Sequence, residues 1–228
     1  MSNDENGAVH DPDALSPDDM AAGEALFARP FTFLKSAPEL EFLPPGDRVE
    51  ICFAGRSNVG KSSLINALTR VGGLARTSNT PGRTQELNFF AAPTQPVYLV
   101  DMPGYGFAEA PKAMVDRWKA LVRDYLRGRA NLARVYVLVD SRHGLKPVDR
   151  ELFDLLNTSA VSFAVVLTKA DKLKTTVLAE VTEKTQEAIA KLPAAFPRIV
   201  TTSSETGLGI DVLRAEIALA LKAWGAIK

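Results

Sequence analysis

Residues 48–70 read RVEICFAGRSNVGKSSLINALTR, and this stretch decides the fold. An apolar run ends at Gly55, four residues follow, and Gly60-Lys61-Ser62 then opens a helical pattern. In such a P-loop, glycines let backbone N–H groups turn inward around phosphates, the lysine reaches the β and γ oxygens, and the serine hydroxyl binds Mg²⁺. The alternative is a glycine-rich turn that fits the P-loop pattern by chance. Such a chance match is expected in on the order of 1% of chains of this length.

Short apolar runs alternate with longer helical patterns along the rest of the chain. Strands are expected at 48–55, 86–92, 97–101, 133–140, 162–169 and 198–204, and helices at 61–70, 114–128, 147–158, 176–192 and 209–224. Nearly continuous apolar strands separated by helices predict an α/β fold with a mostly parallel six-stranded sheet covered on both faces. Ligands bind beyond the carboxyl ends of the strands in such sheets, so functional residues are expected just after each strand.

The chain is long enough for one sizeable core, since 46% of its 228 residues are apolar and no repeat indicates a second domain. Polar, acidic composition predicts a disordered tail at 1–25, followed by an arm at 26–46 that packs on a domain at 47–228. Residues 1–28 hold seven acids and no Lys or Arg, so the remaining 200 carry 27 basic against 20 acidic groups. That excess suits either an anionic partner or an ordinary solvated surface.

The single cysteine, Cys52, lies in an apolar run and is expected to pack as a small hydrophobe. One cysteine allows neither a disulfide within the chain nor a Cys-rich metal site, which suits a reducing cytosol. The N-terminus lacks a basic segment followed by an apolar one, and no apolar run approaches the roughly 18 residues of a membrane span. We therefore expect a soluble cytoplasmic protein without membrane contact.

The strand expected at 97–101 ends in the sequence DMPG, residues 101–104. Beside a P-loop, Asp101 is placed to hold Mg²⁺ through water, and the Gly104 N–H to meet a γ-phosphate. Taken alone, the same four residues make an equally good turn. The predicted phosphate-binding residues are Gly55, Arg56, Ser57, Asn58, Val59, Gly60, Lys61, Ser62, Ser63, Gly82 and Gly104.

Two further strand ends predict a guanine site. In TKAD, residues 168–171, the Asp171 carboxylate can accept from guanine N1–H and the 2-amino group, a donor pair that adenine lacks. Lys169 would lay its aliphatic stem along the base. Ser203, Ser204 and nearby N–H groups are placed to meet guanine O6, although a helix N-cap explains these serines equally well. The predicted guanine-binding residues are Thr168, Lys169, Asp171, Ser203 and Ser204.

Residues 72–84, GGLARTSNTPGRT, form an irregular segment rich in Gly, Thr and Ser. A switch loop needs a threonine whose hydroxyl completes Mg²⁺ ligation only while γ-phosphate is present. Composition does not choose among Thr77, Thr80 and Thr84, and an ordinary surface loop is the alternative.

These motifs, in this order, resemble a translation-factor-class GTPase with a Ras-like P-loop domain. The chain closely resembles the EngB family, also called YihA or YsxC, over about residues 25–225. The stretches that carry the resemblance are GRSNVGKSSLINAL, TPGRTQELNFF, DMPGYGFA and LTKADKL. The resemblance implies GTP hydrolysis with Mg²⁺, docking of the GTP-loaded protein on rRNA and proteins of the large ribosomal subunit or its precursor, and a role in its assembly. It further implies a contribution to normal cell division and septation. It identifies Thr84 as the switch threonine, so the implied metal ligands are Ser62, Thr84 and Asp101.

Tyr105 stands where many small GTPases place a water-orienting glutamine, directly after Gly104. A phenol substitutes poorly for that amide, so we expect slow intrinsic hydrolysis that a group supplied in trans completes, and we assign no catalytic residue. A packing role for Tyr105 in the second switch is favoured over a catalytic one.

Asn58 raises the question of a second cation. In related GTPases that lack the glutamine, an asparagine at this P-loop position can help to hold K⁺ near the phosphates, where it supplies positive charge. The local alternative is a side chain that bonds only its own loop.

Two basic segments are candidate RNA contacts. One is the face of the helix expected at 114–128, where cations at i, i+4 and i+8 lie opposite an apolar face. The other is the loop that follows the strand at 133–140. Basic surfaces of this kind suit RNA phosphates, and a solvated face is the equal alternative. The candidate residues are Lys119, Arg123, Arg127, Arg142, His143 and Lys146.

The leading hypothesis is therefore a monomeric GTP-dependent switch in ribosome assembly. The alternative is a nucleotide-gated interaction module with little useful hydrolysis and a non-ribosomal partner. An ATP-dependent, kinase-like P-loop enzyme is disfavoured by TKAD and by the lack of an evident acceptor site or lid.

Overall fold

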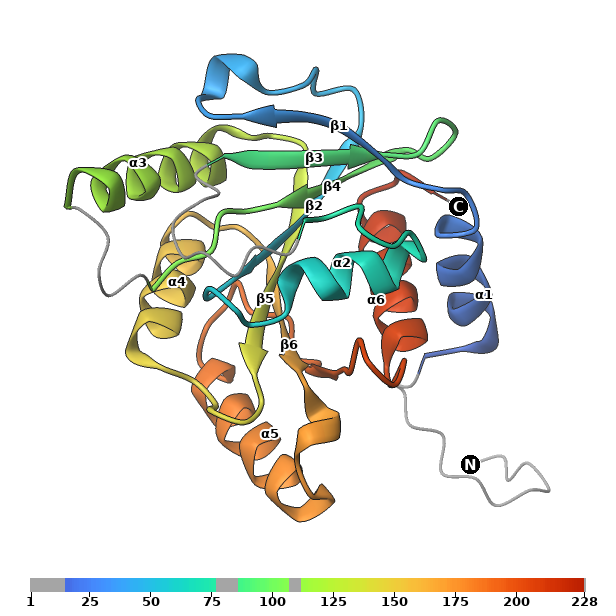
Figure 1. The fold of residues 1–228 in the computed structure, drawn as a ribbon, viewed down its shortest axis with the longest axis vertical. Helices are drawn as coiled ribbons and strands as arrows, with labels where there is room; N and C mark the ends of the chain where they lie inside the picture. The colour runs from blue at the N-terminus through green and yellow to red at the C-terminus, as the bar shows by residue number, and fades with distance from the viewer. Residues whose placement is uncertain (1–14, 77–85, 107–111, 228) are drawn as a thin grey trace, which may run out of the picture.

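Strand β2 (Val49–Gly55) lies at the centre of a seven-stranded sheet, and the P-loop follows directly from it (Figure 1). The structure, a computed structural model, describes residues 15–76, 86–106 and 112–227. The strand order is β1-β3-β4-β2-β5-β6-β7. The other strands are β1 (Thr32–Ala37), β3 (Leu87–Ala91), β4 (Val97–Asp101), β5 (Leu132–Asp140), β6 (Phe163–Thr168) and β7 (Val200–Thr201).

Most of the sheet is parallel, as predicted. β2 pairs in parallel with both β4 and β5, and β6 is parallel to β5 and β7, whereas β3 runs antiparallel to β4. The predicted number of six strands is one too few, because part of the N-terminal arm forms β1, antiparallel to β3. β1 is an edge strand with a register shift between Phe33 and Lys35 and an exposed N-terminal half, so its sequence lacks the continuous apolar character of the inner strands.

Six helices of the described chain cover the two faces of the sheet. One layer contains α1 (Pro17–Leu26), α2 (Lys61–Thr69) and α6 (Ile210–Ala223), and the other contains α3 (Lys112–Gly128), α4 (Pro147–Thr158) and α5 (Thr175–Ile189). Short 3-10 turns occupy Leu40–Phe42 and Ala170–Lys172. Within the described ranges, no helix has the length and apolar character needed to cross a bilayer.

The two cores meet at β2, whose successive side chains point to opposite faces. Ile51 and Phe53 belong to the core beneath α1, α2 and α6, and Cys52 and Ala54 to the core beneath α3, α4 and α5. Cys52 is fully buried, which confirms its predicted packing role, and burial raises the pKa of its thiol well above the usual value.

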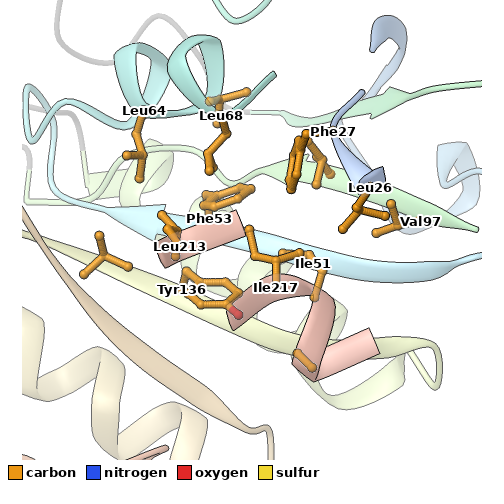
Figure 2. Packing of buried hydrophobic residues seen from close by; sticks show 14 of the residues in the cluster. Leu26, Phe27, Ile51, Phe53, Leu64, Leu68, Val97, Tyr136, Leu213 and Ile217 are labelled. Carbon is orange, nitrogen blue, oxygen red and sulfur yellow. The ribbon is translucent and has the colours of Figure 1, made fainter. Parts of the chain in front are cut away.

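Figure 2 shows Phe53 of β2 packed beneath Leu68 of α2, with Tyr136 of β5 and Leu213 of α6 close by. The rings of Phe53 and Tyr136 stack with their centroids 5.9 Å apart. Each fully buried side chain of this size contributes about 1.5–3 kcal/mol relative to exposure. This packing fixes β2 and α2, the two elements that hold the P-loop between them.

The prediction of a disordered tail over 1–25 is wrong for residues 17–25, which belong to α1. Ser16 and Asp19 form a capping box at the start of this helix, where Ser16 accepts a hydrogen bond from the Asp19 N–H at 3.2 Å. Gly23 lets α1 approach α6 closely, since a Cβ there would lie 2.5 Å from the Ala215 nitrogen. Three of the acids that suggested a solvated tail, Asp18, Asp19 and Glu24, are on this helix, which packs against α6. The other four lie in residues 1–14, outside the described chain.

Two arginines close the C-terminal end of α2. Arg214 of α6 is buried, and its Nε and Nη2 donate to the carbonyl oxygens of Leu68 and Ala67 at 2.9 and 3.0 Å. Arg70, which follows α2 in the left-handed conformation with φ 57°, donates to both carboxylate oxygens of Glu24 at 2.5 and 2.8 Å. The P-loop helix is therefore tied at its far end to α1 and α6.

Candidate nucleotide-binding site

The P-loop makes a tight turn between β2 and α2 that depends on glycine at both of its ends, at Gly55 for space and at Gly60 for backbone conformation. A Cβ on Gly55 would lie 2.8 Å from Val59 Cγ1, and Gly60, the N-cap of α2, has φ 100°. Asn58 is exposed and also has positive φ, at 63°. Ser57 is half-buried and Ser63 exposed, and the N-terminus of α2 that follows carries the unpaired N–H groups that favour phosphate.

The functional ends of the P-loop and β4 meet at one ion pair. Lys61 Nζ contacts Asp101 Oδ1, and the Asp101 side chain is 8% exposed. Parallel pairing brings this about, because Phe53 of β2 stands opposite Asp101 of β4. Ser62 is half-buried, and its hydroxyl donates to the Arg76 carbonyl at 3.1 Å. The Ser62 hydroxyl and the Asp101 carboxylate are oxygen ligands of the kind that Mg²⁺ prefers, so these two predicted residues fit this ion.

The segment after β4 lies against the P-loop backbone. A Cβ on Gly104 would lie 3.1 Å from Ser57 Oγ and 3.3 Å from the Ser57 nitrogen, so glycine allows this close approach without displacing the loop. The Tyr105 N–H donates to the Gly55 carbonyl at 3.3 Å, and the Ser57 N–H donates to the Tyr105 carbonyl at 3.1 Å. Gly104 is thus held beside the predicted phosphate loop. Gly82 and the candidate switch threonines Thr77, Thr80 and Thr84 lie outside the described residues.

TKAD is joined to the P-loop by two side chains. Thr168 Oγ1 donates to the Val59 carbonyl at 2.7 Å, and Lys169 Nζ donates to the Asn58 carbonyl at 2.6 Å. Lys169 has φ 57°, and its Cε would lie 3.6 Å from a Cβ on Gly60, so its stem crosses the loop. The predicted base site and phosphate site therefore form one continuous surface.

Asp171 and Ser203 lie together, as the guanine prediction requires. The Ser203 hydroxyl and then the Lys172 ammonium lower the pKa of the Asp171 carboxyl. Ser203 Oγ also accepts from the N–H groups of Glu205 and Thr206, at 3.2 Å each, while Ser204 is half-buried beside it. The alternative explanation of these serines as a helix N-cap is wrong, because the N-cap of α6 is Gly209.

Asp140, at the end of β5, is a site residue that the sequence analysis missed. Its Oδ2 lies 2.9 Å from Lys169 Nζ, and Arg142 donates to both of its oxygens at 3.0 and 2.8 Å. Burial alone would raise the pKa of Asp140, but the hydrogen bonds from Arg142 and Lys169 outweigh it and hold that pKa well below its usual range. The signal was available, because β5, like β4, ends in Leu-Val-Asp and therefore places a carboxylate at the carboxyl end of a strand.

Tyr105 points away from the phosphate loop and into the core. It is 2% exposed, its hydroxyl donates to Asp149 Oδ1 of α4 at 2.9 Å, and its ring centroid lies 6.0 Å from that of Trp118. Burial, followed by the charge of Asp149, raises the pKa of its phenol well above the usual value. This side chain packs between α3 and α4, and its hydroxyl is bonded to Asp149.

The candidate RNA contacts differ in how free their charges are. Lys119, Arg123 and Arg127 are exposed on α3, with Arg123 paired to the adjacent Asp124 at 3.1 Å. The helix presents the predicted apolar face to the core through Val122 and Tyr125. In the other segment His143 and Lys146 are exposed, whereas the charge of Arg142 is engaged by Asp140.

The P-loop lysine contacts a carboxylate at a strand end, and the loop is joined to a Thr-Lys-x-Asp base site on the same sheet. This combination defines a P-loop GTPase. Residues 50–169 match a family model described as a 50S ribosome-binding GTPase. The chain belongs to the EngB family of GTP-binding proteins.

Two sequences and one solved structure illustrate this membership. The chain is 56% identical to the probable GTP-binding protein EngB of Chelativorans sp. over 209 residues, which cover 88% of this chain and 93% of that protein. It is 58% identical to the Brucella melitensis protein of the same description over 208 residues, which cover 88% and 86%. A crystal structure of a probable GTP-binding protein EngB matches with a TM-score of 0.62 at 27% identity, covering 77% of this chain and all of the other.

Proposed function

We propose that this GTPase is a nucleotide-dependent switch in assembly of the large ribosomal subunit, on which the GTP-bound protein docks. The observation that supports the ribosomal partner is the match to a family described as ribosome-binding GTPases. In this proposal the protein acts in the cytoplasm as a monomer, and its contribution to cell division and septation follows from ribosome supply.

The proposed nucleotide contacts follow the geometry of the P-loop and TKAD. Lys61 leaves Asp101 to bind the β and γ oxygens, Asp171 accepts from guanine, and Ser203 and Ser204 lie toward O6. Ser62 and Asp101 would hold Mg²⁺, with Thr84 as the proposed switch ligand. Mg²⁺ held by these residues would supply positive charge that neutralises charge developing on the phosphates. Competition of labelled GTP by ATP tests the base preference, and strong competition would contradict it.

Slow intrinsic hydrolysis is proposed because the residue after Gly104 is a buried tyrosine. Phosphoryl transfer depends on positioning and electrostatics, and the hydroxyl of Tyr105 is already bonded to Asp149. A partner surface supplied in trans would then complete the site. Turnover of the purified protein at tens per second would end this proposal.

Potassium is a proposed accessory cation. Asn58 is exposed at the P-loop, and its backbone carbonyl accepts a hydrogen bond from Lys169. A cation held there would add positive charge beside the phosphates. Equal hydrolysis rates in K⁺ and Na⁺ would remove this part.

The proposed RNA contact is the exposed face of α3 with Lys119, Arg123 and Arg127. Trp118 of the same helix donates from Nε1 to the Pro103 carbonyl at 3.2 Å, which links α3 to the segment that holds Gly104. Phosphate contacts of this kind supply affinity with strong salt dependence and little sequence preference. The loop cations His143 and Lys146, with Arg142, are the second candidate.

The test is co-sedimentation with purified small and large ribosomal subunits, in GDP and in a non-hydrolysable GTP analogue, across a salt series. Binding to the large subunit with the analogue alone, weakening steeply with salt, is expected. Equal or absent binding in both nucleotides would favour the alternative, a nucleotide-gated module with a non-ribosomal partner.

A further inference from the structure

Asp149 on α4 is fully buried, yet its carboxylate meets three partners. Oδ1 accepts the hydroxyl of Tyr105 at 2.9 Å. Oδ2 accepts the backbone N–H of Lys146 at 2.8 Å and lies 3.4 Å from Nε of Arg56. A buried carboxylate is costly unless it is paired and hydrogen-bonded, so the three partners are held together by one charge.

The three partners belong to different working parts of the molecule. Arg56 is in the P-loop, Tyr105 is in the second switch segment, and Lys146 ends the loop of residues 141–146 between β5 and α4. Arg56 also reaches this loop directly, since its Nη2 donates to the Gly144 carbonyl at 3.4 Å. Two connections therefore run from the nucleotide site to the same loop, one through Asp149 and one directly from Arg56.

Tyr105 is positioned to move with the nucleotide. It follows Gly104, whose N–H is the proposed γ-phosphate contact, and its own backbone is bonded to Gly55 and Ser57 of the P-loop. A shift of Gly104 onto a γ-phosphate must carry the Tyr105 side chain along or break its bond to Asp149. Packed interiors respond to such small shifts by changing between discrete arrangements rather than by deforming continuously.

We propose that Asp149 is a positioning residue that couples the bound nucleotide to the loop of residues 141–146, so that the conformation of this loop differs between the GDP and GTP states. The coupling rests on the nucleotide-dependent switching proposed above. The loop exposes His143 and Lys146. A polyanion that prefers one loop conformation would, by reciprocity, change the preference of the protein between GDP and GTP.

A single fluorescent probe on the loop tests the coupling without any ribosome. Cys52 is the only cysteine and is fully buried, so His143→Cys supplies one accessible thiol for an environment-sensitive dye. The labelled full-length protein is expected to give different emission with GDP and with a non-hydrolysable GTP analogue. Tyr105→Phe, which removes only the hydroxyl, and Asp149→Asn are each expected to abolish that difference. Glu151→Gln, an equal loss of charge at an exposed position of α4, is expected to retain it.

A second probe separates loss of coupling from loss of switching. Trp118 packs on Tyr105, so its emission in a Trp224→Phe background reports the second switch itself. Trp118 is expected to respond to nucleotide in Asp149→Asn while the loop dye does not. The proposal is overturned if the loop dye still responds to nucleotide in both Tyr105→Phe and Asp149→Asn. It is also overturned if, in the parent protein, Trp118 emission responds to nucleotide and the loop dye does not. If neither probe responds in the parent, the proposed switching fails together with the coupling.

Discussion

Strands β4 and β5 flank β2 on either side and end in the same three residues, Leu-Val-Asp. In the proposed function they serve the two ends of one nucleotide. Asp101 holds Lys61 of the P-loop, and Asp140 holds Lys169 of the base site. They differ in what else binds them, since Arg142 gives Asp140 a second cation. In the proposed function, Lys61 exchanges Asp101 for phosphate, whereas Lys169 keeps Asp140 while its stem lies along a base. On that proposal, identical strand ends produce an exchangeable ion pair and a permanent one.

Lys61→Ala breaks the exchangeable pair and has the largest expected effect. It removes a charge-assisted phosphate contact and leaves Asp101 buried without its cation, so affinity for GTP and GDP should fall by roughly 100-fold, about 3 kcal/mol. Fluorescent-nucleotide titration measures this fall. Lys184→Ala, at an exposed position of α5, serves as the control. Unchanged affinity in Lys61→Ala would mean that the P-loop lysine does not reach the phosphates.

Asp140→Asn breaks the permanent pair. Freed Lys169 and Arg142 are less well positioned, so affinity for GTP and GDP should fall alike by roughly tenfold, about 1.4 kcal/mol. A loss confined to GTP would place Asp140 at the phosphate end instead.

Removal of Mg²⁺ sharpens the comparison of the two carboxylates. Because Asp101 is the proposed metal-binding carboxylate, chelation of Mg²⁺ should weaken GTP binding in the parent and in Asp140→Asn, and should have little further effect in Asp101→Asn. Titrations with and without a chelator measure this difference. If the chelator weakened GTP binding equally in all three proteins, Asp101 would not be a ligand of Mg²⁺.

The stability of the Asp140 ion pair should depend on pH in one direction. Folding lowers the pKa of the Asp140 carboxyl below its unfolded value of 3.8. The stabilisation that this carboxylate gives the folded protein is therefore complete above pH 3.8 and is lost as the pH falls through the lower pKa of the folded state. Urea unfolding should therefore show Asp140→Asn less stable than the parent at pH 6, with a gap that narrows as the pH falls below about 3.8. A gap that widens on acidification would contradict this assignment.

Arg142→Ala has the smallest expected effect. The Arg142 side chain is 42% exposed, and exposed pairs contribute roughly 0–1 kcal/mol, so nucleotide affinity should change by less than about fivefold. Combined with Asp140→Asn in a double-mutant cycle, it shows whether the second cation helps to position Lys169. An effect as large as that of Asp140→Asn would make Arg142, rather than Lys169, the main partner.

The parts of the site that follow local sequence rules were predictable. The P-loop, Asp101 and TKAD each occupy a strand end, and an apolar run predicts a buried strand whatever its neighbours are. The same rule would have identified Asp140, whose strand ends like β4. The helix α1 was missed because its stability comes from close contact with α6 at Gly23, which a count of polar residues does not detect.

Asp149 could not be predicted from the sequence. In sequence it is one of several acids on α4, with the periodicity of a helix. Its bond to the Lys146 N–H is a local contact at the start of α4, but its role arises from Arg56 and Tyr105, which the fold brings to it from separate segments. Tyr105 is 44 residues away in the chain, and such a pair leaves no local pattern. The orientation of Tyr105 into the core has the same origin, although its poor fit to catalysis was visible in the residue type.

The arginines that close the far end of α2 have an electrostatic consequence for the phosphate end. Aligned peptide dipoles place roughly half a negative charge at the C-terminus of a helix and half a positive charge at its N-terminus. The Arg214 guanidinium lies on the C-terminal carbonyls of Ala67 and Leu68, where it offsets the negative end. An anion bound at Lys61 is then attracted by the positive N-terminal end of α2 and is repelled less by the negative C-terminal end, which lies about 13 Å away.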